Sequence, residues 1–348
     1  MSFLFFGRRK PQPQHPDPFV VQPVAPPPVA KPAPQSAATS APQPSAMRQV
    51  YALALNDERA VQALATPDLA QMNLLVAASQ AFAKIGTEPR YTPRQPSMLA
   101  QVLEALSDDE ASLRELSRIV SKDPQLTGNL LRASNSPMYR VSSSPVESVE
   151  RAAALLGTTG IRTLLAASLM QPLATGPASG LGLFGEIVWE HSLYSASAAE
   201  AWAGRKADAD PFTAHLLALM NGLGCVAVYR VLNDLHAAQP GLVPDAAVIA
   251  DALETHSALI AARIATHWGL SERTRQALEA QSSAGPVNAR SGLAQALQFG
   301  LLAGAMTMLC RKRKVTEEDG LARIEAGGFP GEPVPRIWDR LLLAYGRS

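Results

Sequence analysis

The sequence has few cysteines, few aromatic residues and almost no excess of charge of either sign. Its 348 residues include only two cysteines, Cys225 and Cys310, which excludes a disulfide-stapled fold and suits a reducing compartment. Lys and Arg total 31 against 30 for Asp and Glu, and aromatic residues make up 5% of the chain. Nucleic-acid binding calls for a basic stripe with aromatic side chains. We therefore expect a cytoplasmic protein without a nucleic-acid partner.

Long hydrophobic runs and a secretion signal are also missing. The longest apolar candidates, LLVAASQAFA and GLLAGAMTMLC, fall short of the roughly 18 residues that span a bilayer. At the N-terminus, MSFLFFGRRK places its basic residues after the apolar ones, and no small-residue cleavage site follows, unlike a signal peptide. The sequence predicts no transmembrane segment. A peripheral membrane contact of the first residues is an alternative, less favoured than a disordered start.

Proline is abundant in one stretch only. Residues 11–46 contain 12 of the 28 prolines, and Asp17 and Lys31 are the only charged residues there. Such a composition buries too little apolar surface to offset the entropy of ordering, and its prolines favour extended polyproline II backbone. Residues 1–46 are therefore predicted to be a disordered Pro-rich tail that acts as a spacer. Docking of VAPPPVAKPAP into an aromatic groove of a partner is the alternative.

From residue 47 onward, apolar residues recur at helical spacing, and no stretch alternates with period two, so the predicted fold class is all-α. The predicted units are a helical extension (47–88), a core domain (89–288) and a C-terminal helical extension (289–348). Helix boundaries are predicted at Thr66-Pro67, Asp123-Pro124, Ser136-Pro137, Ser144-Pro145 and Gly157, with a capping box at 107–110 and longer helices near 184–204, 211–233, 245–267 and 271–281.

Three stretches come in the order and spacing of a known family. They are SRIVSKDPQLTGNLLRASNSPMYRVSSSPVESVERAAALLG (118–157), WEHSLYSASAAEAWA (189–203) and ETHSALIAARIATHWGLSERTRQAL (254–278). The most specific part is the DPxLTxxLLRxxNSxxY pattern, followed by the SSPVxSVERAxxLLG helix. Over residues 89–288 the chain resembles the HDOD domain, the HD-related output domain of bacterial signalling proteins. The resemblance implies a multi-helix bundle related to HD-superfamily phosphohydrolases, usually without their metal-dependent activity, that serves as a regulatory or protein-interaction module.

The resemblance also indicates where a metal site would lie. An HD hydrolase holds its metal with a His at the start of one helix, an adjacent His-Asp pair on the next and further ligands downstream, so that a bound water loses its proton more easily. His191 and His256 match family positions, but Asn221 and Gly222 stand in place of the His-Asp pair, and Gln281 stands where a late His is often found. An amide is a poor ligand and glycine offers none. We therefore expect no bound metal and no metal-dependent catalysis.

The histidines and Asn221 also have structural interpretations. His191 and His256 share helical faces with apolar residues, which favours hydrogen-bonded core histidines over ligands. Asn221 is either a bridge inside the old metal pocket or a buried polar residue with a backbone partner. The three other histidines of the core, near helix ends or polar faces, are expected to be solvated: His215, His236 and His267.

Asp123, Asn135 and Ser136 carry the family pattern, and a helix-capping role is favoured over a binding role for them. Gly222 and Gly224 each cost about 1 kcal/mol relative to Ala within a helix. They predict either a very close neighbouring helix or a break at this point.

No other catalytic pattern is present: the sequence has no HExxH, no P-loop, no GxSxG elbow and no GxGxxG after a strand. The basic run Arg311 to Lys314 is followed by acidic residues and is interpreted as a solvated helix end. The predicted function is a non-catalytic signal-transduction protein that binds a protein partner or a small signal molecule, without a cofactor, through Asp123, Asn135, Ser136, His191, Asn221 and His256. The alternative is a metal-dependent phosphodiesterase acting on nucleotides or cyclic dinucleotides.

Overall fold

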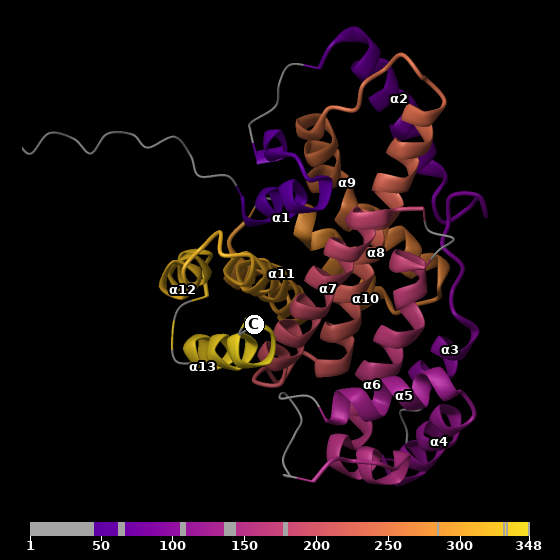
Figure 1. Cartoon of the computed structure of the whole chain (residues 1–348), viewed down its shortest axis with the longest axis vertical. Coiled ribbons are helices and arrows are strands. Elements are labelled where there is room, and N and C mark those ends of the chain that lie inside the picture. Colours follow the sequence, from indigo (N-terminus) through magenta and orange to yellow (C-terminus); the bar gives the residue numbers. More distant parts are fainter. Residues whose placement is uncertain are drawn as a thin grey trace, which may run out of the picture. The chain divides into compact units, whose positions relative to one another are not determined.

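Figure 1 shows the protein, a computed structural model, as a set of packed α-helices, with no strand among the described residues. The structure describes residues 45–61, 67–104, 109–135, 144–176, 180–283, 285–329, 331 and 333–346. The all-α prediction is confirmed. The predicted Pro-rich tail up to residue 44, the start of the predicted capping box at 107–108, Thr66 and Ser136-Pro137 lie outside the described residues.

The helices of the N-terminal half are α1 (Ala46–Leu55), the 3-10 helix η1 (Glu58–Val61), α2 (Leu69–Lys84), α3 (Ser97–Glu104), α4 (Asp109–Ser121), α5 (Pro124–Ser134) and α6 (Val149–Thr175). Those of the C-terminal half are α7 (Gly182–Ala203), α8 (Pro211–Ala237), α9 (Ala246–His267), α10 (Glu272–Glu279), η3 (Ala280–Ser282), η4 (Val287–Ala289), α11 (Gly292–Arg311), α12 (Glu317–Ala326), α13 (Pro333–Leu341) and the π-helical turn η5 (Leu342–Gly346). The longer helices predicted between 184 and 281 are all present, with ends shifted by a few residues.

Four long helices form the centre of the fold. Helix α7 packs between α11 and α8, and α8 packs between α7 and α9 (Figure 1). Helices α3, α4 and α5 pack on α6, which also contacts α7 and α8. Helix α1 contacts α7, α9 and α11, and the described residues from Ser45 onward belong to one compact unit. The segments before and after the predicted core domain therefore pack directly on its helices.

The two glycines of α8 allow close approach of the helices on either side. A Cβ atom at Gly222 would lie 1.9 Å from Oγ of Ser192 on α7, and one at Gly224 would lie 2.2 Å from the carbonyl oxygen of Ser257 on α9. Helix α8 continues through both positions. Of the two alternatives predicted for these glycines, the close neighbour is therefore confirmed and the helix break is wrong.

Helix α11 approaches α7 in the same way. A Cβ at Gly300 or Gly304 would come within 2.5 Å or 2.3 Å of atoms of Ser195 on α7. Next to this contact, the rings of Trp202 and Phe299 stack with centroids 4.5 Å apart, and the nearby ring of Phe329 meets both edge-on. Small residues bring the two backbones together, and the aromatic rings fill the space beside them.

Two helix boundaries differ from the prediction. Helix α1 ends at Leu55, well before the break predicted at Thr66-Pro67, because Asn56 adopts the left-handed conformation (φ 52°) that caps a helix. Helix α6 begins after Ser148, whose hydroxyl accepts from the amide of Arg151 at 3.2 Å, and not after Ser144. Gly157, with φ 65°, interrupts α6 as predicted, but the chain resumes helical geometry at once and continues to Thr175.

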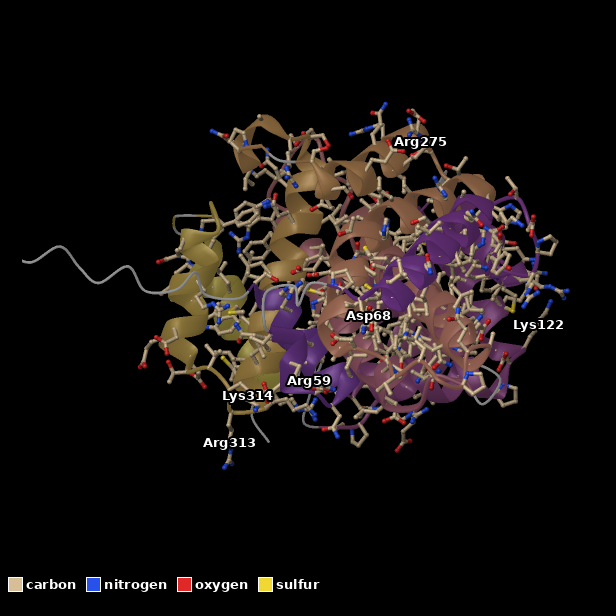
Figure 2. The ribbon with its side chains drawn as sticks, turned by 90° about the horizontal axis from the view of Figure 1, so that it is seen from above. Arg59, Asp68, Lys122, Arg275, Arg313 and Lys314 are labelled. Carbon is tan, nitrogen blue, oxygen red and sulfur yellow. The ribbon has the colours of Figure 1, made fainter. Side chains whose placement is uncertain are left out.

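Charged side chains lie over the outer surface of the helices (Figure 2). In the predicted basic run, Arg311 pairs with Glu190 at 2.5 Å, and Lys312 lies 3.9 Å from the same carboxylate. Lys314 pairs with Glu58 of η1 at 3.0 Å. All three basic side chains are well exposed, as expected for a solvated helix end, and such surface pairs contribute little to stability.

Three helices are long and apolar enough to cross a membrane by length and composition alone: α6, α8 and α11. In the fold, 44%, 89% and 72% of their apolar windows are buried against other helices. The uninterrupted apolar runs of the sequence are shorter than a bilayer span. These helices nevertheless reach the mean hydropathy of a membrane span, although Gly, Ser and Thr interrupt their apolar residues. Whether the protein meets a membrane stays a prediction.

Candidate functional site

Asn221 lines a cavity of about 430 Å³ between α1, α8, α9 and α11, which we call the Asn221 cavity. A cavity of this size suits a small molecule or a few side chains of a partner. Its polar lining residues are Ser45, Tyr51, Asn221, Glu254, Ser257, Gln281, Arg290 and Gln298. This lining contains no His and no Cys, and Glu254 is its only carboxylate.

The amide side chains of the cavity have different surroundings. Gln281 donates from Nε2 to the carbonyl oxygens of Ala277 at 2.9 Å and Ala294 at 3.1 Å, so it ties the end of α10 to α11. Asn221 is only 6% exposed. Gln298 Oε1 is buried and has no hydrogen-bond partner among the described residues. A buried oxygen without a donor is a place where a bound molecule or a water can donate a hydrogen bond.

Helix α1 closes one side of the cavity and is fastened to α9 by charge. Arg48, which is 8% exposed, pairs with Asp251 and donates from Nε to Glu254 at 2.9 Å. The Ser45 hydroxyl donates to the same Glu254 carboxylate, and Arg48 also donates to the carbonyl oxygen of Ala60 at 3.3 Å. No local sequence pattern marks Arg48 as a partner of residues some 200 positions away, so sequence reasoning missed it.

Tyr51 and Cys225 meet beside the cavity. The Tyr51 hydroxyl lies 3.6 Å from the Cys225 sulfur, and both side chains are buried. Burial raises the pKa of the Cys225 thiol and holds the pKa of Tyr51 well above its usual range. Both groups are therefore protonated at neutral pH, and a buried, protonated thiol is a poor nucleophile.

His191 lies deep between α7 and α11, 3% exposed. Its Nε2 is 3.2 Å from the carbonyl oxygen of Leu301 and 3.1 Å from Oγ of Ser195. Because a carbonyl oxygen can only accept, Nε2 carries the hydrogen and has no lone pair for a metal. Burial lowers the pKa of His191 to about 4, so the ring is neutral at neutral pH. The interpretation as a hydrogen-bonded core histidine agrees with this geometry.

The position after Asn221 has no room for a side chain. Ser192, the neighbour of His191, donates from its hydroxyl to the carbonyl oxygen of Val188 at 2.7 Å and occupies the space where a Cβ of residue 222 would lie. An aspartate at Gly222 could therefore enter only if α7 or α8 shifted.

His256 belongs to different surroundings. It is half-buried, and its ring lies against Phe82 of α2 with centroids 4.9 Å apart. Burial lowers the pKa of His256, and the charge of Arg263 lowers it further. The next residue, Ser257, lines the Asn221 cavity, whereas His256 does not. The structure thus brings Asn221 to a cavity but does not bring His256 to it.

Asp123 and Asn135 act at the two ends of α5. The Asp123 carboxylate accepts from the amide of Leu126 at 3.1 Å, which caps the start of the helix. The Asn135 amide donates to the carbonyl oxygens of Leu131 and Val146, both at 2.8 Å, and its oxygen accepts from the amide of Val146 at 2.7 Å. Neither residue lines the Asn221 cavity. The favoured capping interpretation agrees with these bonds; Ser136 lies outside the described residues.

His215 corrects one expectation. It is 6% exposed and not solvated, and its Nδ1 lies 3.0 Å from Oε2 of Glu200 on α7. Its position near the start of α8 suggested solvent exposure, but the packing of α7 against α8 covers it. Sequence spacing within one helix does not reveal such a partner on another.

Comparison with known protein families identifies the central part of the chain. The profile of the HDOD domain matches residues 92–284, which is more than half of the chain. The chain belongs to the HDOD domain family. The resemblance given for residues 89–288 is therefore confirmed. In this HDOD protein, α1, α2 and α11 to α13 lie outside the matched residues, although α1, α11 and Gly327 after α12 contribute to the Asn221 cavity. No curated protein sequence matches the chain.

Two solved structures with TM-scores above 0.5 show the same fold at low sequence identity. A protein from Shewanella amazonensis SB2B, provisionally named a metal-dependent phosphohydrolase, is 16% identical with a TM-score of 0.54, covering 79% of this chain and 99% of that one. A second one from the same organism, provisionally named a phosphohydrolase, is 18% identical with a TM-score of 0.52, covering 78% and 94%. A protein from Marinobacter aquaeolei VT8, provisionally named a signal transduction protein, is 16% identical with a TM-score of 0.47, covering 80% and 65%.

Proposed function

We propose that this HDOD protein is a non-catalytic signal-transduction protein and that its Asn221 cavity takes part in binding a protein partner or a small signal molecule. The observation that carries the proposal is the contact at Gly222. In the place of a metal-binding aspartate, the backbone of α8 meets Ser192 of α7 so closely that a Cβ would lie 1.9 Å from Oγ.

The donor chemistry around this contact also supports the proposal. A divalent metal needs several side-chain lone pairs at one point. Nε2 of His191 is committed as a donor to Leu301, and Gln281 is tied to two backbone carbonyls. Among the described residues, no group of three or more His, Cys, Asp or Glu side chains could hold a metal ion. The residues present do not fit a metal centre.

A binding role is favoured by the shape and polarity of the cavity. It has about 430 Å³ of space and a lining rich in neutral amides and hydroxyls. The buried Oε1 of Gln298 has no partner among the described residues, and α1 covers the cavity through the Arg48 ion pairs. Such a site favours a neutral, hydrogen-bonding group, because amide side chains both donate and accept.

The non-catalytic part is tested with the purified full-length protein. We expect elemental mass spectrometry to find no stoichiometric transition metal, and we expect no hydrolysis of bis-p-nitrophenyl phosphate or of cyclic dinucleotides with added Mn²⁺ or Fe²⁺. Turnover that is lost on chelation and regained with metal would overturn the proposal in favour of a phosphodiesterase.

The binding part is tested by replacing Asn221 with Leu, which has the same branched shape but no hydrogen-bonding groups. Asn233→Leu is the matched control, since Asn233 is an exposed asparagine on the same helix. Native mass spectrometry and affinity capture from the native cell should show a bound molecule or partner with the wild type and Asn233→Leu but not with Asn221→Leu. Equal recovery with both variants would place the binding site elsewhere.

A further inference from the structure

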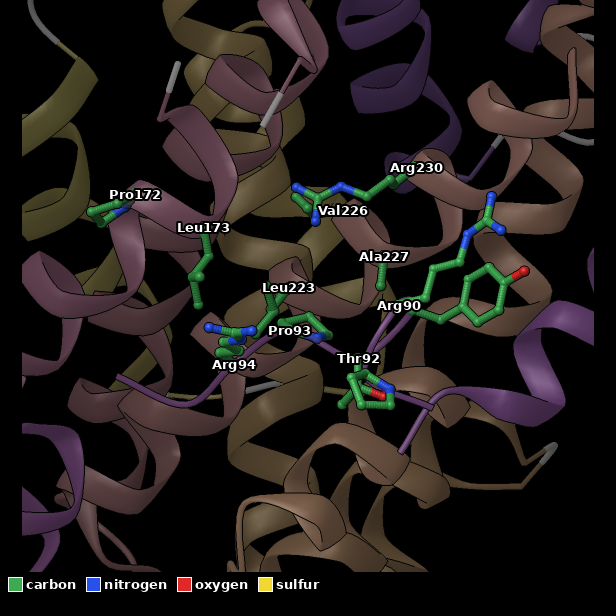
Figure 3. A pocket seen from close by; sticks show the side chains of 12 residues that line it. Arg90, Thr92, Pro93, Arg94, Pro172, Leu173, Leu223, Val226, Ala227 and Arg230 are labelled. Atoms are coloured by element: carbon green, nitrogen blue, oxygen red, sulfur yellow. The ribbon is translucent and has the colours of Figure 1, made fainter. Parts of the chain in front are cut away.

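A second cavity, of about 290 Å³, lies against α8, and we call it the arginine cavity. It is lined by the segment 89–94 before α3, by Pro172 and Leu173 of α6, and by four residues of α8 (Figure 3). The α8 residues are Leu223, Val226, Ala227 and Arg230.

The arginine cavity and the Asn221 cavity lie on different faces of α8. The four α8 residues follow the i, i+3, i+4, i+7 spacing of one helical face. Asn221 precedes Leu223 by two residues, which corresponds to a rotation of about 200° around the helix axis. No residue lines both cavities.

The lining of the arginine cavity carries positive charge without compensation. Arg90, Arg94 and Arg230 reach it from two segments of the chain (Figure 3), and its lining contains no carboxylate. None of the three forms an ion pair or a side-chain hydrogen bond within the described part of the chain. By contrast, Arg48 and Arg275 each pair with two carboxylates.

The segment that presents two of these arginines is held in place by hydrogen bonds. Oγ1 of Thr92 accepts from the amide of Gly86 at 2.7 Å and donates to the carbonyl oxygen of Glu88 at 2.9 Å. The indole of Trp268 donates to the carbonyl oxygen of Pro93 at 3.0 Å. Thr92, Pro93 and Trp268 are all buried. Prolines at 89 and 93 restrict the backbone further. Arginines on such a segment lose less backbone entropy when they bind a ligand.

The chemistry of this cavity indicates its ligand. Guanidinium groups bind phosphate through two parallel hydrogen bonds, and the apolar side chains of Leu173, Leu223 and Val226 offer a surface for an uncharged body. The volume is at the lower end of ligand sites, which excludes a large ligand. We propose that the arginine cavity binds a small phosphorylated molecule of the nucleoside monophosphate class, with its phosphate at the arginines and its body against α6 and α8.

The proposal is tested by isothermal titration calorimetry of the full-length protein with three probes: AMP, adenosine and inorganic phosphate. AMP should bind saturably and at least about tenfold more tightly than either part alone, because phosphate and body contacts add. Arg230→Gln should weaken AMP binding by about tenfold or more, since charge-assisted hydrogen bonds to phosphate are lost. Arg94→Lys should also weaken it, because an ammonium keeps the charge but not the paired donors.

Arg205→Gln is the matched control, an exposed arginine that does not line the cavity and should bind AMP as the wild type does. Equal affinities of Arg205→Gln and Arg230→Gln, phosphate binding as tightly as AMP, or no saturable AMP binding would each overturn the proposal. The proposed binding of AMP in the arginine cavity goes beyond the proposed function and does not involve Asn221. Asn221→Leu should leave AMP binding unchanged, so the two proposals can fail separately.

Discussion

The two faces of α8 are packed in opposite ways. On the side of Asn221, Gly222 and Gly224 flank that residue and let α7 and α9, respectively, approach until no Cβ would fit, and the polar groups of the Asn221 cavity are buried or committed to hydrogen bonds. On the other, Arg230 and the two arginines of the 89–94 segment surround an apolar floor without a carboxylate. Substitutions at tightly packed positions are expected to cost more stability than substitutions of arginines that form no ion pair. The following predictions test this difference.

The largest effect is expected from His191, which is buried between α7 and α11. Its pKa is about 4 in the folded protein against an ordinary 6.5, so the unfolded chain binds more protons between these values. The neutral His191 ring therefore makes its full contribution to the free energy of unfolding above about pH 6.5. That contribution, roughly 3 kcal/mol at 1.36 kcal/mol per pKa unit, is lost as pH falls toward 4. Urea unfolding between pH 7 and 4 should show a steeper loss for the wild type than for His191→Gln. The exposed His267→Gln should keep the wild-type slope; identical slopes for both variants would contradict the burial argument.

Gly224→Ala should destabilise the protein by about 2 kcal/mol, because the added methyl group meets the carbonyl oxygen of Ser257 and forces α8 and α9 apart. Gly128→Ala in α5 is the control, since nothing lies within 4 Å of its added methyl group. That substitution should raise stability by up to about 1 kcal/mol through helix propensity alone. Thermal unfolding followed by circular dichroism measures both, and stabilisation by Gly224→Ala would show that the helices are not in close contact.

Arg48→Met should lower stability by about 1–2 kcal/mol, because it leaves Asp251 and Glu254 without their cation at a partly exposed site. Urea unfolding provides the measurement. Arg59→Met, at an exposed arginine paired only with Asp57, should change stability little. If the two variants behave alike, α1 is not fastened to α9 by charge.

The smallest effect is expected at the arginine cavity. Arg230→Gln should change the free energy of unfolding by no more than about 0.5 kcal/mol, since the side chain makes no ion pair there. A larger loss in urea unfolding would mean that the arginine supports the fold, and the contrast between the two faces would then disappear.

The sequence was sufficient for the fold class and for most helix positions, because these depend on local signals. Apolar spacing located α7 to α10, the Asp123-Pro124 pair located the start of α5, and the two glycines of α8 indicated a close neighbour. The early end of α1 at Asn56 was missed, since a left-handed asparagine has no distinctive neighbours in the sequence.

The candidate site was predicted only in part, because cavities form between segments distant in the chain. Asn221 lines a cavity, but His256 lies against Phe82, and His191 is hydrogen-bonded to Leu301. The Arg48 ion pairs and the arginine cavity depend on α1, α6, α8 and the 89–94 segment meeting in space. No spacing within one element could have predicted those encounters.

The packing of α11 against α7 has a practical consequence for dividing this protein into parts. The match to the HDOD family ends at residue 284, before Gly292 where α11 begins. A polypeptide cut at that point would lose α11, which covers Ser195 and stacks Phe299 on Trp202. The side of α7 that packs against α11 would then face water. We expect such a fragment to self-associate or precipitate, so a fragment that keeps this packing should extend at least to the end of α11 at Arg311.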